Sequence, residues 1–275
     1  MVLLLSTLHC HQRHIQNLKS EEHRGPPHFR PIPKQQLLLL LSYPGPSMDK
    51  LLLWMSVFTS LLSEAFAQTD LNQKVFVFPR ESETDYVKLI PWLEKPLQNF
   101  TLCFRAYSDL SRSQSLFSYS VNSRDNELLI YKDKVGQYSL YIGNSKVTVR
   151  GLEEFPSPIH FCTSWESSSG IAEFWVNGKP WVKKGLQKGY TVKSSPSIVL
   201  GQEQDTYGGG FDKTQSFVGE IADLYMWDSV LTPENIHSVD RGFPPNPNIL
   251  DWRALNYEIN GYVVIKPRMW DNKSS

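Results

Sequence analysis

The chain has 275 residues, with 28 basic and 28 acidic side chains and a formal net charge of zero. This balance excludes both the strongly basic surface typical of nucleic-acid-binding domains and the polybasic patch typical of proteins held on anionic membranes. Hydrophobic residues make up 40% of the chain, which is enough for a globular core.

The first 67 residues have the composition of segments that precede a secreted domain. Met48 and a short charged start lead into an apolar run over 51–62, and Ala65 and Ala67 form a small-x-small cleavage pattern. Together they predict a signal peptide over 48–67, with a buried N-terminal helix as the alternative. The run is too short to span a membrane, which takes about 20 residues. We interpret residues 1–47, which are rich in proline and leucine, as an upstream extension that is disordered or not translated.

Residues 68–275 then form the mature chain, which has the size of one ordinary domain. Its two cysteines are Cys103 and Cys162. An even pair in a secreted chain predicts a disulfide, and two buried free thiols are the alternative. Closing a loop of about 60 residues stabilises the folded state by about 4 kcal/mol in the chain-entropy model.

Short apolar segments with an alternating pattern predict β-strands throughout the mature chain. In the segment 99–107 the even-numbered residues are apolar, and Cys103 lies on the other face. Cys162 likewise lies opposite Phe161 and Trp165, which fits two neighbouring strands of one sheet joined by a disulfide. The other segments of this kind are 75–78, 116–119, 127–131, 138–142, 159–165, 171–175, 179–182, 198–200, 217–227 and 251–265.

Turn and cap residues complete the pattern. Asn177-Gly178 and Asn260-Gly261 are typical of tight hairpin turns. One helix is predicted, with Thr232 as N-cap, Pro233 at its first position, an end near Val239 and Gly242 closing it. Many short strands and one helix, without solenoid repeats or heptads, predict an all-β sandwich or jelly roll.

Two sites match the N-glycosylation pattern of a secreted protein. Asn99 begins Asn-Phe-Thr on the side of its strand that we expect to face solvent, so we predict a glycan there. Asn272 begins Asn-Lys-Ser in the C-terminal tail, and its use stays open.

An acidic loop at 201–210 is followed closely by Gln215. Glu203 and Asp205 point to the same side of an extended segment, with the Gln204 main-chain carbonyl between them. Oxygen donors suit calcium, and the absence of Cys and His from this loop argues against zinc or copper. The loop lacks the EF-hand pattern, so a calcium site needs ligands from elsewhere in the chain. A solvated acidic turn is the alternative.

The segment 160–167 reads His-Phe-Cys-Thr-Ser-Trp-Glu-Ser and fits the pentraxin signature His-x-Cys-x-Ser/Thr-Trp-x-Ser/Thr. The segments 125–128, 202–205 and 216–221 resemble the same family, and the resemblance covers about residues 69–270. It implies a flattened jelly roll of two antiparallel sheets, similar to the legume lectins, with one short α-helix on the face opposite the ligand site. It also implies a ring of five identical subunits.

The resemblance further implies two calcium ions per subunit. The first would be held by Asp125, Asn126, Glu203, the Gln204 carbonyl and Asp205. The second would be held by Glu203, Asp205 and Gln215, which leaves coordination positions for a ligand oxygen. Residues in contact with that ligand would be Asn126 and Gln215, together with an apolar wall of Leu129, Tyr131 and Tyr141. The alternative for the wall is ordinary strand packing.

In this family such a site belongs to a secreted plasma protein without catalytic activity. The resemblance implies a calcium-dependent pattern-recognition lectin of innate immunity. Its ligands would be phosphoethanolamine, pyruvylated or sulfated glycans, DNA and chromatin, and amyloid fibrils, with complement components as further partners. The alternative is a jelly-roll glycoside hydrolase with the pattern Glu-x-Asp-x-x-Glu, but Gly208 stands where the second Glu is required.

Overall fold

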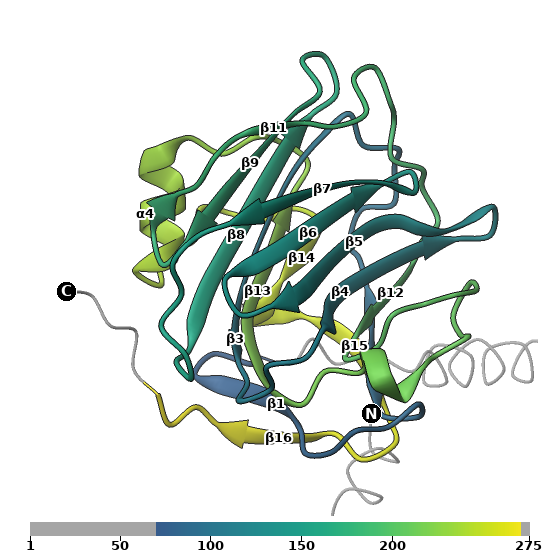
Figure 1. Cartoon of the computed structure of the whole chain (residues 1–275), viewed down its shortest axis with the longest axis vertical. Helices are drawn as coiled ribbons and strands as arrows, with labels where there is room; N and C mark the ends of the chain where they lie inside the picture. Colours follow the sequence, from purple (N-terminus) through teal and green to yellow (C-terminus); the bar gives the residue numbers. More distant parts are fainter. Residues whose placement is uncertain (1–69, 271–275) are drawn as a thin grey trace, which may run out of the picture. The chain divides into compact units, whose positions relative to one another are not determined.

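The computed structural model describes residues 70–270. The upstream segment, the signal peptide and the Asn272 sequon all lie outside these described residues. Between residues 70 and 270 the chain forms two antiparallel sheets and one α-helix, as the jelly-roll prediction requires (Figure 1). Within the same range no helix is long and apolar enough to cross a membrane.

The first sheet contains nine strands. Seven follow the order β10-β9-β8-β3-β13-β1-β16, while β11 pairs with β9 and β14 with β13. Their bounds are β1 (Lys74–Phe78), β3 (Asn99–Tyr107), β8 (Ile159–Glu166), β9 (Ile171–Val176), β10 (Lys179–Pro180), β11 (Lys184–Gly185), β13 (Gly219–Trp227), β14 (Leu250–Asp251) and β16 (Val264–Pro267).

The second sheet contains seven strands in the order β15-β2-β12-β4-β5-β6-β7. Their bounds are β2 (Tyr86–Ile90), β4 (Gln114–Val121), β5 (Arg124–Lys134), β6 (Gln137–Ile142), β7 (Ser145–Arg150), β12 (Ser197–Leu200) and β15 (Asn256–Asn260). Two 3-10 turns, η1 (Lys213–Gln215) and η2 (Trp252–Ala254), complete the described structure.

The core lies between the two sheets and is rich in aromatic side chains. Phe100 and Phe104 on β3 are fully buried, with Trp165 and Phe161 as their partners on β8. Each large apolar side chain buried in this way contributes about 1.5–3 kcal/mol. These are the residues whose alternation predicted β3 and β8. The alternation arises because one face of each strand packs into the core between the sheets.

Several boundaries differ from the prediction. The segment 217–227 is a strand only from Gly219 onward, and its pairing shifts at Asp223, where φ is 48°. The 3-10 turn η2 interrupts the predicted strand over 251–265. Three strands were not predicted, namely β2, β7 and the two-residue β11. In β7, which lies at the sheet edge, only Val149 is fully buried, whereas β2 alternates buried and partly exposed residues between two prolines.

The helix α4 (Pro233–Asp240) begins as predicted. The Thr232 side chain accepts a hydrogen bond from the backbone N–H of Asn235, and Gly242 follows the helix with a φ of 88°. The helix and the segment before it cover the face of β3 that carries Thr101 and Arg105. The expectation that this face is open to solvent is therefore wrong for these two residues, while Asn99 at the start of the strand is half-buried.

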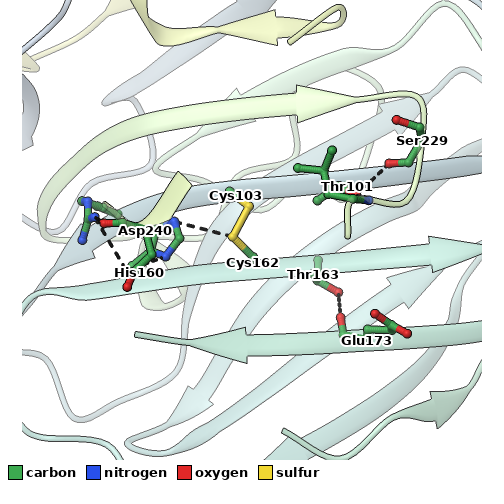
Figure 2. The surroundings of a disulfide bond; sticks show 10 residues. Thr101, Cys103, His160, Cys162, Thr163, Glu173, Ser229 and Asp240 are labelled. Atoms are coloured by element: carbon green, nitrogen blue, oxygen red, sulfur yellow. Dashed lines mark hydrogen bonds and ion pairs between the residues drawn. A yellow bond between two sulfur atoms is a disulfide. The ribbon is translucent and has the colours of Figure 1, made fainter. Parts of the chain in front are cut away.

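Cys103 and Cys162 are directly opposed on β3 and β8 and form a disulfide bond (Figure 2). Beside it lies His160, whose Nδ1 is 2.9 Å from Oδ1 of Asp240 at the end of α4. Burial lowers the pKa of His160, so a neutral imidazole links the helix to the sheet. Among the described residues, Cys103, His160 and Cys162 are the one group of three closely spaced Cys, His, Asp or Glu side chains. Because its sulfurs are joined to each other, this group offers no thiolate to a metal.

Candidate calcium site

A row of paired residues crosses the outer face of the seven-stranded sheet. Ser118 on β4 lies between Val199 on β12 and Leu129 on β5, and Leu129 is paired in turn with Tyr141 on β6. Val199 and Leu129 are buried without belonging to the core cluster between the sheets. They therefore lie on the face of the sheet opposite the core, where the apolar wall was predicted.

Gln204 ties this loop to the row. Its side-chain amide nitrogen donates to the carbonyl and hydroxyl of Ser118 at 3.2 and 3.1 Å and to the Ser197 carbonyl at 3.0 Å. Its side-chain oxygen accepts from the backbone N–H of Gly208. Because both ends of the amide are occupied, the main-chain carbonyl is the oxygen that Gln204 has left to offer a cation.

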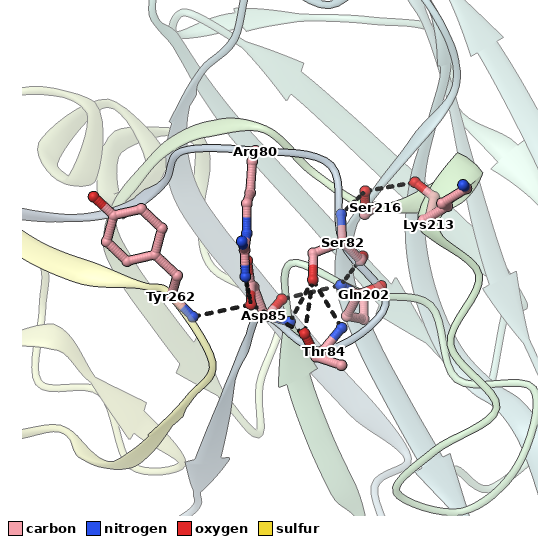
Figure 3. Close-up of polar contacts among 8 residues, drawn as sticks. All are labelled: Arg80, Ser82, Thr84, Asp85, Gln202, Lys213, Ser216 and Tyr262. Atoms are coloured by element: carbon pink, nitrogen blue, oxygen red, sulfur yellow. Dashed lines mark hydrogen bonds and ion pairs between the residues drawn. The ribbon is translucent and has the colours of Figure 1, made fainter.

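Gln202 fixes the other end of the loop (Figure 3). Its Nε2 donates to the carbonyls of Ser82 and Asp85, at 2.6 and 3.0 Å, in the connection from β1 to β2. The Asp85 carboxylate accepts from Arg80 and from the backbone N–H of Tyr262. These contacts lower the pKa of Asp85 to about 2, with the Arg80 hydrogen bond as the largest cause, so Asp85 is ionised across the physiological range. The loop is anchored before and after Glu203.

The start of β5 supplies the second group of predicted ligands. Asp125 and Asn126 are half-buried, and the turn after β6 is held to this segment because Asn144 N–H donates to the Asn126 carbonyl at 3.0 Å. The next residue, Glu127, is fully buried and accepts from the Tyr190 hydroxyl and the Lys193 N–H. These contacts hold the backbone of the segment in place.

The third group is the turn η1, which ends in Gln215. Asp212 precedes the turn and caps it, accepting from the N–H of Thr214 at 2.8 Å. Phe217, two residues beyond Gln215, donates its N–H to the Gly201 carbonyl at 2.9 Å. This bond joins the turn to the start of the acidic loop.

The electrostatics of Glu203 indicate that Asp205 and Asp125 lie near enough to act on its carboxylate. The pKa of Glu203 is raised to about 7, mainly by burial and also by the carboxylates of Asp205 and Asp125, while the Asn126 amide opposes the shift. Glu203 is only 5% exposed, whereas Asp205 is exposed. A buried carboxylate beside two others is costly unless a cation or a proton neutralises it.

Unpartnered oxygens indicate that a cation fits here. The side-chain oxygens Oδ1 of Asn126, Oε2 of Glu203 and Oε1 of Gln215 are buried and have no hydrogen-bond partner among the described residues. Buried polar atoms without a partner are uncommon in folded proteins and indicate an unseen ion or water. These three atoms come from the three segments that the calcium prediction named, and all three are hard oxygen donors suited to calcium.

The apolar wall has both buried and accessible parts. Leu129 is buried, Tyr131 and Tyr141 are half-buried, and the Glu203 carboxylate is near enough to Tyr131 to raise the pKa of its phenol, to which burial contributes most. The exposed Lys146, paired with Tyr141, has its ammonium 5.4 Å from the centre of that ring. The wall thus lies between the carboxylates and a positive charge.

The metal ligands stay a prediction, and sequence reasoning missed the residues that support their segments. No local pattern in the sequence indicates the roles of Ser118 and Arg80. Gln204, the partner of Ser118, is 86 residues away, and the contact of Arg80 with Asp85 depends on the geometry of the loop between them. Gln202 lies in the segment 202–205 that resembles the family, but its role as an anchor of the loop required the folded chain.

Comparisons with known proteins agree with this geometry. Residues 74–267 match the sequence profile described as the Pentaxin family. The chain is 81% identical over 224 residues to serum amyloid P-component from Mus musculus, covering 82% of this chain and 100% of that protein. It is 72% identical over 223 residues to the Homo sapiens protein of the same name, covering 81% of this chain and 100% of that one.

Among solved structures, the fold is similar to a native heptameric SAP-like pentraxin from Limulus polyphemus. The TM-score is 0.66 at 23% sequence identity, covering 73% of this chain and 98% of that chain. At this level of identity the likeness concerns the fold alone.

Proposed function

The chain belongs to the pentraxin family, and from this membership and the convergent oxygen donors we propose that it is a secreted, calcium-dependent pattern-recognition lectin. It is not an enzyme, since the serum amyloid P-components to which it is 66–81% identical are non-enzymatic pentraxins. The observation that carries the proposal is the trio of buried, unpartnered oxygens on Asn126, Glu203 and Gln215.

In this proposal each chain holds two calcium ions. Asp125, Asn126, Glu203, the Gln204 carbonyl and Asp205 hold the first, while Glu203, Asp205 and Gln215 hold the second. The raised pKa of Glu203 supports a shared position between two dications, because a carboxylate that is costly to ionise alone becomes favourable beside positive charge. The bound ions supply open coordination positions to anionic oxygens of a ligand.

We propose that the ligands are phosphoethanolamine, pyruvylated or sulfated glycans, chromatin and amyloid fibrils. The wall of Leu129, Tyr131 and Tyr141 would receive their apolar parts, with Lys146 adding positive charge at its edge. A homopentamer would give five sites on one face, so weak single contacts would add up on repetitive surfaces through a high effective concentration. The mature domain would be 68–275 after removal of a signal peptide at 48–67, with a glycan on Asn99 and complement components as further partners.

The direct test is capture on phosphoethanolamine beads. The purified protein should bind in millimolar calcium, elute when a chelator is added and leave the immobilised ligand chemically unchanged. Sedimentation in the same buffer gives the number of subunits, which the proposal sets at five although the Limulus relative is a heptamer. Equal capture in excess chelator would refute the proposal.

A further inference from the structure

We infer that Arg112 is a positioning residue for the second calcium ion, acting through the turn that carries Gln215. Arg112 lies in the connection between β3 and β4, about a hundred residues before that turn in the chain. Its Nη1 donates to three main-chain carbonyls, those of Ser113 at 2.8 Å, Thr214 at 3.1 Å and Ser216 at 2.8 Å. The inference rests on the proposed function, since it concerns the same site.

Two of these carbonyls flank Gln215 directly. Arg112 therefore holds the peptide on both sides of the residue whose side-chain oxygen is buried without a partner. The Nε atom of Arg112 donates to Glu81 at 3.0 Å, so the guanidinium is fixed at its other end by the connection from β1 to β2. The planar, multidentate guanidinium suits this bridging role in a way that the single ammonium of lysine does not.

Apart from Arg112, the turn is held from outside by the bond from the Phe217 N–H to the Gly201 carbonyl. Residues Asp212 to Thr214 are exposed, and the internal bonds of the turn are those of its Asp212 cap and of Ser216, whose hydroxyl donates to the Lys213 carbonyl. The Ser82 N–H reaches the same hydroxyl at 3.4 Å, a long hydrogen bond. A three-residue 3-10 turn is a marginal element by itself, so its position depends on these outside contacts.

The effect on metal binding should be confined to one ion. In the proposed arrangement Gln215 contributes to the second ion, which has three protein ligands, and does not contribute to the first. Displacing Gln215 removes a third of the protein ligands of the second ion and none of those of the first. A purely structural role for Arg112 would instead lower the stability of the metal-free protein and weaken both ions together.

The test is calorimetric titration of calcium into metal-free wild type, Arg112→Ala and Arg112→Lys, with Arg150→Ala as the matched control. Arg150 is an exposed arginine on β7 whose Nε contacts Gln137. We expect the calcium affinity of the weaker binding step to fall at least tenfold in Arg112→Ala and by a smaller factor in Arg112→Lys. The calcium affinity of the tighter step should stay within twofold of wild type. The midpoint of thermal unfolding of calcium-free Arg112→Lys should stay within about two degrees of wild type.

Three results would overturn the inference. The first is unchanged calcium affinities in both variants, and the second is an equal loss of affinity for both ions. The third is a loss of affinity in the weaker step that is no larger than the loss of stability of the metal-free protein accounts for. Arg112→Lys keeps the test valid if Arg112→Ala fails to fold. A wild type that binds fewer than two ions would refute the proposed function itself. If wild type binds two ions and the Arg112 variants bind both with unchanged affinity, only the role of Arg112 is refuted.

Discussion

Gln204 is held to Ser118 by three hydrogen bonds, two from its side-chain amide at 3.2 and 3.1 Å and one from its backbone N–H at 3.3 Å. The two residues are 86 positions apart in the chain. Because Ser118 is paired with Leu129 on the next strand, these bonds join the acidic loop to the strand that carries the apolar wall. The proposed metal ligands and the proposed apolar wall thus share one buried anchor.

Replacing Ser118 with Ala should therefore weaken calcium binding. The change leaves the backbone N–H of Gln204 without a partner in a buried place, which costs about 1–3 kcal/mol, while the side-chain amide keeps the carbonyls of Ser118 and Ser197. We expect calcium affinity to fall about tenfold in a calorimetric titration. Thr163→Val is the matched control, because it removes a buried hydroxyl that donates to the Glu173 carbonyl on the other sheet. Equal calcium affinities in Ser118→Ala and wild type would contradict the anchor.

The sequence predicted the strands with a strong apolar alternation and the capped helix, because these signals are local. It did not predict β7, where only Val149 is fully buried and the edge strand needs little apolar surface. The contacts of Gln204 with Ser118 and of Arg112 with Ser216 span 86 and 104 residues, and no periodicity encodes them. The acidic loop indicated Glu203 and Asp205 as metal ligands, and a family resemblance supplied the full predicted set, whereas the supporting contacts required the folded chain.

The metal-free protein should lose stability as the pH rises because of Glu203. Burial raises its pKa from the ordinary 4.5 to about 7 in the folded state, so the folded protein binds this proton more tightly than the unfolded chain does. Its stabilising effect is complete below pH 4.5 and disappears as the pH rises to about 7. The shift corresponds to about 3 kcal/mol at 1.36 kcal/mol per pKa unit.

Chemical denaturation of calcium-free protein at pH 5 and pH 7.5 measures this effect. Glu203→Gln, which does not titrate, should gain stability relative to wild type as the pH rises over this window. If the free energies of unfolding of wild type and Glu203→Gln differ by the same amount at both pH values, Glu203 is not buried among carboxylates.

Tyr131→Ala should separate ligand binding from calcium binding. The side chain is half-buried in the apolar wall, yet it supplies no predicted metal ligand. We expect the affinity for phosphoethanolamine, measured in saturating calcium, to fall about tenfold while calcium affinity stays within twofold. Phe243→Ala removes an aromatic side chain that is 73% exposed beyond α4 and serves as the control. An unchanged ligand affinity would remove the wall from the account.

The disulfide should matter for stability and not for calcium. Replacing both Cys103 and Cys162 with Ala opens a loop with a sequence separation of 59 residues. We expect a loss of about 4 kcal/mol in the free energy of unfolding, measured with guanidinium chloride. Because the bond lies on the helix-covered sheet, calcium affinity in the folded variant should match wild type. A stability within 1 kcal/mol of wild type would contradict the prediction.

The most direct measurement of the central claim is the number and strength of calcium sites in wild type and in Glu203→Gln. Calorimetric titration of the metal-free wild type should show two ions per chain, and the variant should bind both of them more weakly, since one carboxylate is shared between them. Two sites of full affinity in the variant, or a wild type that takes up no calcium, would contradict the account.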